Sequence, residues 1–224
     1  MQSVGKTATH RRTRLTAAQR RESILEAATE VFAAAGYRAG KVSDVAARVG
    51  VTEPVIFQNF GSKAALYAAV LDRMAGQTQA ELQALTDHHG SSPELLAHVL
   101  SPPPGSQLHG PGAHHQLFAD AATLAADPDL AEPARRAARA VADHLAGMVR
   151  HGQANGGIRA DADPEAAAWL LLSVLSARPL RAAAMPDPAH LEDGVAALAL
   201  QALIPPTPAP PPTGHGHHDQ AHYR

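Results

Sequence analysis

Residues 42–63 read VSDVAARVGVTEPVIFQNFGSK and carry the most informative pattern in the chain. The spacing of their apolar positions predicts two short helices joined at Gly50, with a third helix beginning behind them. Thr52 is a suitable N-cap for the second helix, and Pro54 falls in its first turn, where a missing N–H costs little. Such a helix-turn-helix can place its second helix in a DNA major groove. The alternative is an ordinary corner between two helices of an all-α domain.

The second of these helices has an outer face and an N-terminal end that we expect to be exposed, and both are suited to reading base edges. Glutamine and asparagine pair with adenine, valine can contact a thymine methyl group, and glutamate can accept from a cytosine amine. Glutamate can also repel phosphate, which would select against unwanted sites. The expected exposed residues are Thr52, Glu53, Pro54, Val55, Gln58 and Asn59.

The run from Ile24 to Leu66 resembles the DNA-binding domain of the tetracycline-repressor-like (TetR) family, in its first helix, its helix-turn-helix and the start of a long fourth helix. The resemblance implies an all-α fold of about nine helices, with a three-helix DNA-binding head and a larger helical domain for ligand binding and dimerisation. It also implies that Glu53, Pro54, Val55 and Gln58 meet base edges and that Lys63 binds phosphate.

Two positions depart from the family's pattern. Phe57 stands where the family usually has a tyrosine whose hydroxyl binds phosphate, and Gly40 stands where a threonine commonly contacts phosphate. Lys41 and Ser43 can substitute by charge and hydroxyl. We therefore include Lys41, Ser43 and Phe57 in the predicted DNA-binding surface.

The composition describes a globular protein, with 45% hydrophobic and 18% charged residues, and it has no cysteine for disulfide or thiol chemistry. No apolar run approaches the roughly 20 residues that span a bilayer, and the polar, basic N-terminus is unlike a secretory signal, so we expect a cytoplasmic protein. Ten basic and five acidic side chains in residues 1–63 leave this part positive, although the whole chain has a net charge of −2. A basic N-terminal module on an acidic body fits a DNA-binding head.

The chain divides into four predicted segments. Residues 1–16 form a disordered basic arm, 17–61 the helix-turn-helix domain, 62–204 the helical ligand-binding and dimerisation domain, and 205–224 a disordered tail rich in proline and histidine. We expect Thr16 to cap the first helix and Gly36 to end it, and we expect one apolar helix over 164–183. The arm can reach phosphates or a narrow minor groove through Arg11, Arg12 and Arg14, or it is a tail without a role.

In the larger domain we expect an apolar pocket suited to a small lipophilic ligand. Met74, Phe118 and Trp169 are its candidate walls, with plain core packing as the alternative, and His98 and His115 are candidate polar lining residues. The resemblance implies that the final helices pair with those of a second subunit in a four-helix bundle. The corresponding interface residues are Trp169, Leu172, Leu175, Val195 and Leu198.

Neither a metal site nor a catalytic site is predicted. His215, His217, His218 and His222 can hold transition metals only loosely, because no ordered scaffold or cysteine supports them. Asp161, Asp163 and Glu165 cluster at a loop–helix junction, where capping explains them. We predict neither an enzyme nor a cofactor.

The sequence therefore predicts a homodimeric, ligand-responsive transcriptional regulator. Repression is the family's usual sign, so we expect a repressor that is released from a palindromic operator by a small lipophilic molecule. An activating role is the first alternative. A ligand-independent architectural DNA binder and a histidine-rich metal-binding or sequestering protein are the alternatives from other classes.

Overall fold

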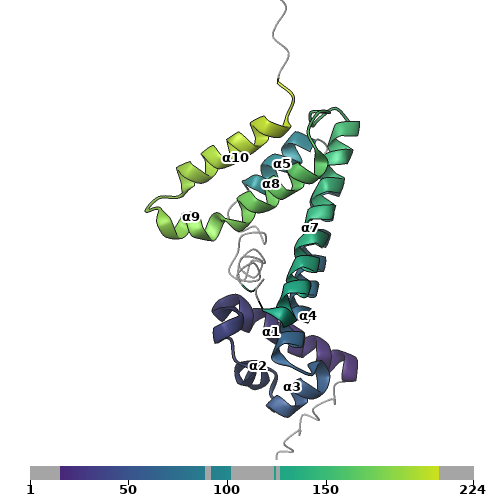
Figure 1. The fold of residues 1–224 in the computed structure, drawn as a ribbon, viewed down its shortest axis with the longest axis vertical. Helices are drawn as coiled ribbons and strands as arrows, with labels where there is room; N and C mark the ends of the chain where they lie inside the picture. Colours follow the sequence, from purple (N-terminus) through teal and green to yellow (C-terminus); the bar gives the residue numbers. More distant parts are fainter. Residues whose placement is uncertain (1–15, 89–91, 102–123, 125–126, 207–224) are drawn as a thin grey trace, which may run out of the picture.

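Helices at one end of the molecule form a small head, and a long pair of helices joins it to the body at the other end (Figure 1). The computed structural model describes residues 16–88, 92–101, 124 and 127–206. All the regular structure in these ranges is helical and none of it is strand, which confirms the predicted all-α fold. The helices are α1 (Ala17–Ala39), α2 (Val42–Val49), α3 (Glu53–Phe60), α4 (Lys63–His88), α5 (Ser92–Leu100), α7 (Pro128–Ala154), α8 (Pro164–Ser176), α9 (Arg178–Ala184) and α10 (Ala189–Leu203).

The first helix begins at the predicted residue and is interrupted at the predicted glycine. Thr16 and Gln19 form a capping box, in which Gln19 N–H donates to Thr16 Oγ1 at 3.2 Å and Thr16 N–H donates to Gln19 Oε1 at 2.9 Å. Gly36 leaves the helical conformation, with φ 70° and ψ 173°, so the helix is interrupted at the predicted residue before a short continuation to Ala39. A glycine tolerates this conformation, and the chain changes direction there.

The apolar segment over 164–183 is two helices and not one, so that prediction was wrong. It breaks at Ala177, between α8 and α9. Pro179 in the first turn of α9 has no N–H to donate to the carbonyl of Leu175, and it disfavours helical backbone at Arg178. The break fits a helix that restarts at the proline.

A continuous apolar core runs from the head into the body. In the head it contains Ile24, Phe32, Ile56, Leu66 and Tyr67, each at most 1% exposed. It continues along α4 into the contact between α4 and α7, the most extensive helix pair in the described part of the chain. No helix in the described ranges is both long and apolar enough to cross a membrane.

Candidate nucleic-acid interface

A left-handed glycine makes the turn between α2 and α3. Gly50 has φ 69° and ψ 36°, and its N–H donates to Ala47 O at 3.3 Å. Val51 N–H donates to Ala46 O at 3.0 Å, which closes the turn around a small residue that is only 3% exposed. A side chain at position 50 would be strained in this conformation, so the glycine is what lets the two helices meet here.

The third helix presents one face to solvent and buries the other. Ile56 and Phe60 are buried in the head, whereas Glu53, Pro54 and Gln58 are exposed. Phe57 is 40% exposed and Val55 is half-buried. Thr52 precedes α3 as expected and is exposed, but its side chain makes no capping hydrogen bond. The arrangement leaves most of the predicted base-reading side chains available to a ligand outside the head.

Asn59 lies differently from the prediction of a fully exposed face. It is half-buried, and its amide Nδ2 donates to Val55 O in its own helix at 2.7 Å. Reading adenine with this amide would require that hydrogen bond to break. Gln58, which is exposed, is therefore the better-placed amide of the two.

Arg21 is a residue of this site that the sequence analysis did not single out. Its guanidinium lies 4.0 Å from the centroid of the Phe60 ring, and its Nη1 donates to Asn59 O at 2.5 Å. The side chain thereby attaches α1 to the C-terminal end of α3. Thirty-eight residues separate Arg21 from Asn59, so only the folded structure brings them together.

The start of α4 is capped, and its lysine has contacts within the head. Ser62 Oγ accepts from Ala65 N–H at 3.0 Å. Lys63 Nζ donates to Arg38 O at 3.3 Å and lies 4.8 Å from the centroid of the Tyr37 ring. Burial lowers the pKa of Lys63. This places the ammonium at the C-terminal end of α1, close to the N-terminus of α4.

The backbone at Gly40 leaves no room for the threonine that the family pattern has there. An added Cβ would lie 2.7 Å from Phe32 Cδ1 and 2.8 Å from Gly36 O. Gly40 N–H donates to Gly36 O at 3.0 Å, which holds Gly40 close to the end of α1. Lys41 and Ser43, the expected substitutes, are both exposed beside it at the start of α2.

The head meets the body at an aromatic cluster. Tyr37 and Phe32 each lie near Tyr67 of α4, with ring centroids 5.0 and 5.2 Å away. Burial and the nearby carboxylates of Asp127 and Asp129, at the start of α7, raise the pKa of Tyr37. Tyr37 therefore contacts aromatic rings of the head and of α4, and its pKa depends on carboxylates at the start of α7.

Three of the predicted ligand-binding residues lie in the described part of the chain, on three different helices. Met74 is fully buried in the core, His98 is half-buried in α5, and Trp169 is 40% exposed on α8. His115 and Phe118 lie outside the described residues, as do Arg11, Arg12, Arg14 and the four histidines of the tail. Among the described residues, no group of three or more histidine or acidic side chains could hold a metal ion.

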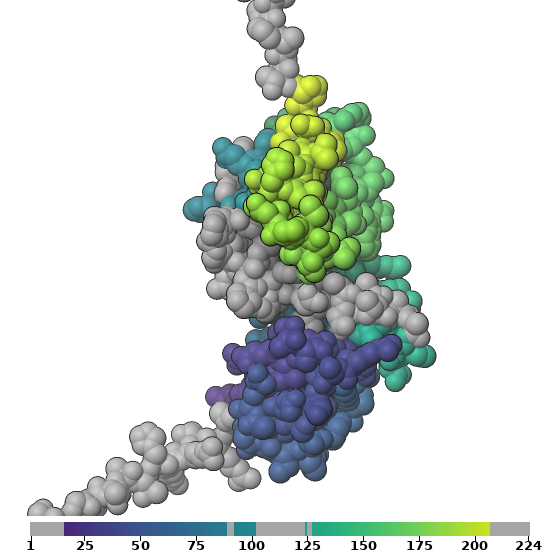
Figure 2. All heavy atoms as spheres, turned by 90° about the vertical axis from the view of Figure 1, so that its left-hand side faces the viewer, coloured from purple at the N-terminus to yellow at the C-terminus, as the bar shows by residue number. Residues whose placement is uncertain are grey.

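Apolar side chains are exposed on α8, α9 and α10. Figure 2 shows the last helices of the chain, in light green to yellow, at the surface of the body. Of the predicted interface residues, Leu198 is 68% exposed, while Leu172, Leu175 and Val195 are half-buried. Leu180 on α9 is 71% exposed, and sequence analysis did not name it. Exposed leucines on neighbouring helices form the kind of surface that proteins cover with a partner.

The acidic cluster before α8 has structural partners. Asp163 Oδ1 accepts from Glu165 N–H at 2.9 Å and caps α8, as expected. Asp161 accepts from the guanidinium of Arg159 at 2.6 and 2.7 Å. These contacts account for both aspartates without a catalytic role.

Comparison with known proteins agrees with the geometry of the head. Residues 24–70 match the family described as bacterial regulatory proteins, tetR family. The HTH-type transcriptional activator FasR of Mycolicibacterium smegmatis is 48% identical over 60 residues, which are 27% of this chain and 27% of that protein. The chain thus aligns with only about a quarter of the length of this curated relative.

Solved structures share the fold over most of the chain. A TetR-family transcriptional regulator from Cytophaga hutchinsonii has a TM-score of 0.72 at 20% identity, over 87% of this chain and 100% of that one. The regulator FadR of Bacillus subtilis, solved in complex with stearoyl-CoA, has a TM-score of 0.60 at 20% identity, over 81% of this chain and 98% of that one. At these identities the likeness concerns the fold.

Proposed function

We propose that the chain, whose residues 24–70 match the TetR family of bacterial regulators, is a ligand-responsive transcriptional repressor that binds a palindromic operator as a homodimer. Members of this family are DNA-binding regulators and not enzymes. Of the alternatives, neither an architectural DNA binder nor a metal-sequestering protein is favoured by the comparisons. The proposal includes a cytoplasmic location, where a bacterial regulator meets its DNA.

The main support for the proposal is that α3 buries one face in the head and exposes the other to solvent. Ile56 and Phe60 fix the helix to the head, while Glu53, Pro54 and Gln58 remain exposed on it. In this account Gln58 contacts a base edge, Thr52, Val55 and Phe57 make the surrounding contacts, and Asn59 contributes mainly by shaping the helix end.

Phosphate contacts come from the edges of the head. Lys41 and Ser43 are exposed at the start of α2, and Lys63 lies at the start of α4. Free N–H groups at a helix N-terminus favour an anion, and the nearby charges add to that preference. Arg11, Arg12 and Arg14 would extend the contact along the backbone or into the minor groove.

A second copy of the chain covers the exposed apolar face in this proposal. Trp169 and Leu198 are exposed on α8 and α10, and Leu172, Leu175 and Val195 lie half-buried on the same two helices. One recognition helix reads only a half-site, so a two-fold dimer matches a palindromic operator.

We divide the chain into a head over 17–61 and a body over 62–204, with the arm before them and the tail after them. Helix α4 belongs to both, since it packs on α1 and α3 at one end and on α7 at the other. An effector that changes how α4 and α7 pack would therefore move the recognition helix. The FadR complex with stearoyl-CoA supports a lipophilic effector in the body, with Met74, His98, His115, Phe118 and Trp169 as its candidate contacts.

Selection of bound sequences from random duplex DNA tests the proposal. The full chain should enrich an inverted repeat, and Gln58→Ala should relax the preference at one position in each half-site. Gln201→Ala, an exposed glutamine on α10, is the matched control and should leave the motif unchanged.

Two results would contradict the proposal. Enrichment without any motif, together with strong salt dependence, would mean that the head senses only phosphate charge, as in an architectural DNA binder. A reporter gene behind the selected site decides the sign of regulation. Repression supports the proposal, and activation overturns the repressor part of it.

A further inference from the structure

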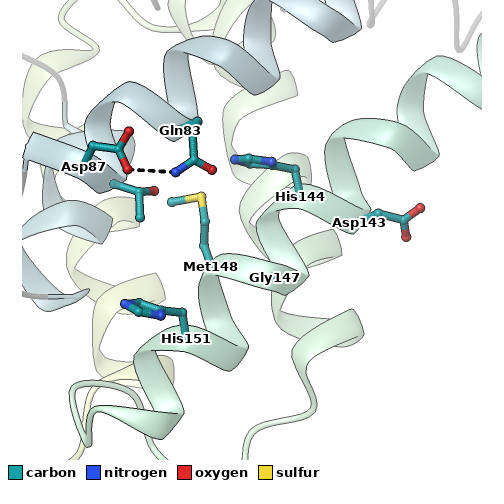
Figure 3. A pocket seen from close by; sticks show the side chains of 8 residues that line it. Gln83, Asp87, Asp143, His144, Gly147, Met148 and His151 are labelled. Atoms are coloured by element: carbon teal, nitrogen blue, oxygen red, sulfur yellow. Dashed lines mark hydrogen bonds between the residues drawn. The ribbon is translucent and has the colours of Figure 1, made fainter.

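A groove of about 510 Å³ lies between α4 and α7, apart from the residues proposed for the lipophilic effector. Gln83, Thr86 and Asp87 line it from α4, and Asp143, His144, Gly147, Met148 and His151 line it from α7 (Figure 3). Its volume falls within the range of roughly 300–1,000 Å³ that is usual for small-molecule sites. About half of its lining surface is polar, which distinguishes it from an apolar pocket.

The groove contains a buried polar atom of His144, Nε2, that lacks a hydrogen-bond partner in the described part of the chain. Burial lowers the pKa of His144, which favours the neutral imidazole. In the tautomer with its proton on Nδ1, Nε2 is an acceptor. A buried polar atom without a hydrogen bond is costly, so a ligand that supplies one would be stabilised there.

The donors of the neighbouring side chains are largely used already. Thr86 Oγ1 donates to Leu82 O at 2.9 Å, and Gln83 Nε2 donates to Asp87 Oδ1 at 2.9 Å. Their remaining capacity consists mainly of acceptors, namely Gln83 Oε1, Thr86 Oγ1 and the Asp87 carboxylate. Gln83, Asp87 and His144 lie around one space in Figure 3, whereas Asp143 points away from it.

The carboxylates that line the groove make it negatively charged. It contains two aspartates and neither lysine nor arginine. His151 Nε2 lies 2.9 Å from Asn155 Nδ2, so its ring is engaged along its own helix. A ligand that fits this set must carry N–H donors and a positive charge.

We propose that this groove binds a small alkylammonium ligand, whose N–H groups donate to His144 Nε2 and to the Asp87 carboxylate while its carbon chain lies against Met148. The site is separate from the lipophilic effector site. Because it bridges α4 and α7, its occupation would change the packing that connects the head to the body. Only this regulatory consequence rests on the proposed function, since binding itself is measured without DNA.

Calorimetric titration of the full chain with putrescine tests the proposal. We expect saturable binding of one ligand per chain. Tetramethylammonium has the charge but no N–H donor, and butanediol has hydroxyl donors but no charge, so both should bind at least about tenfold more weakly.

Two variants locate the site. His144→Phe keeps a ring of similar size and removes the acceptor, and Asp87→Asn changes an exposed side chain and should leave folding intact. Each should weaken putrescine binding at least about tenfold. His190→Phe and Asp193→Asn are matched controls at exposed positions of α10 and should bind as the wild type does.

Three outcomes would overturn the inference. These are no saturable binding of putrescine, equal binding of tetramethylammonium, and unchanged affinity in both His144→Phe and Asp87→Asn. Each leaves operator binding untouched, so failure of this inference is distinguishable from failure of the proposed function. If putrescine binds as expected but no DNA motif is selected, the groove is a ligand site and the proposed regulatory function is wrong.

Discussion

The guanidinium of Arg21 lies 4.0 Å from the centroid of the Phe60 ring, and its Nη1 donates to the backbone carbonyl of Asn59. One side chain of α1 thereby holds the C-terminal end of the helix that we propose reads DNA. The orientation of α3 depends on this contact as well as on the burial of Ile56 and Phe60.

Removing this contact should loosen α3. Arg21→Ala loses a cation–π contact and a hydrogen bond, so we expect a loss of about 1–2 kcal/mol in the free energy of unfolding and weaker operator binding. Denaturant unfolding and fluorescence anisotropy measure the two effects. Arg139→Ala, at an exposed position of α7, is the control. Equal behaviour of both variants would show that Arg21 does not position the helix.

The crowding at Gly40 predicts that even a small side chain is harmful there. In Gly40→Ala the new Cβ meets Phe32 Cδ1 and Gly36 O at less than 3 Å, so we expect a destabilisation of about 1–3 kcal/mol. Gly76→Ala is the matched control, since an added Cβ there meets nothing within 4 Å. Because alanine is the better helix former, this control should gain up to about 1 kcal/mol. A stable Gly40→Ala variant would contradict the packing described for α1.

The sequence was sufficient to predict the features that depend only on residues close together along the chain. Thr16, Gly50 and Asp163 act where local capping and turn chemistry predicted. The features that it could not predict depend on distant segments. Arg21 meets α3 across 38 residues, and the groove at His144 forms only when α4 and α7 pack together.

Two errors of prediction have local causes that were visible in the sequence. Pro179 divides the apolar segment into α8 and α9, although its hydrophobicity suggested one helix. Asn59 was placed on the exposed face by its register, but its amide found an acceptor at Val55 O. A missing backbone N–H explains the first difference, and a hydrogen bond from a side chain to the backbone explains the second.

The ion pairs of Glu192 predict a pH dependence of stability. Arg181 donates to both carboxylate oxygens at 2.5 and 2.9 Å, and Arg178 Nε lies 3.0 Å from Glu192 Oε2. The hydrogen bonds from Arg181, helped by the charge of Arg178, lower the pKa of Glu192 from its ordinary value of 4.5. A lowered pKa stabilises the folded chain above the ordinary value, and this contribution is lost as the pH falls through the lowered one.

Comparison with Glu192→Gln isolates this contribution. At neutral pH we expect the variant to be less stable by about 1–3 kcal/mol. The difference from the wild type should shrink between about pH 6 and pH 3, as the wild-type carboxylate becomes protonated. Urea unfolding across this range measures it, with Glu26→Gln, at an exposed position of α1, as the control. A difference that stays constant with pH would contradict the assignment.

A charge at the exposed apolar face should dissociate the proposed dimer. Leu198 is 68% exposed in the single chain, so Leu198→Lys should leave each subunit folded while raising the dimer dissociation constant at least about tenfold. Sedimentation equilibrium measures the dissociation constant, and circular dichroism checks the fold. Gln201→Lys is the control on the same helix. A dimer that is equally stable in both variants would place the interface elsewhere.

The most direct test of the account is the ratio of affinities for the selected inverted repeat and for a shuffled duplex of the same composition, at one salt concentration. For the wild type we predict a ratio of about 10³ or more, as is usual for specific DNA-binding proteins. In Gln58→Ala the ratio should fall by about 10- to 100-fold for each half-site, because the loss of one base contact costs roughly 1–3 kcal/mol. A wild-type ratio near one would contradict the central claim that α3 reads DNA sequence.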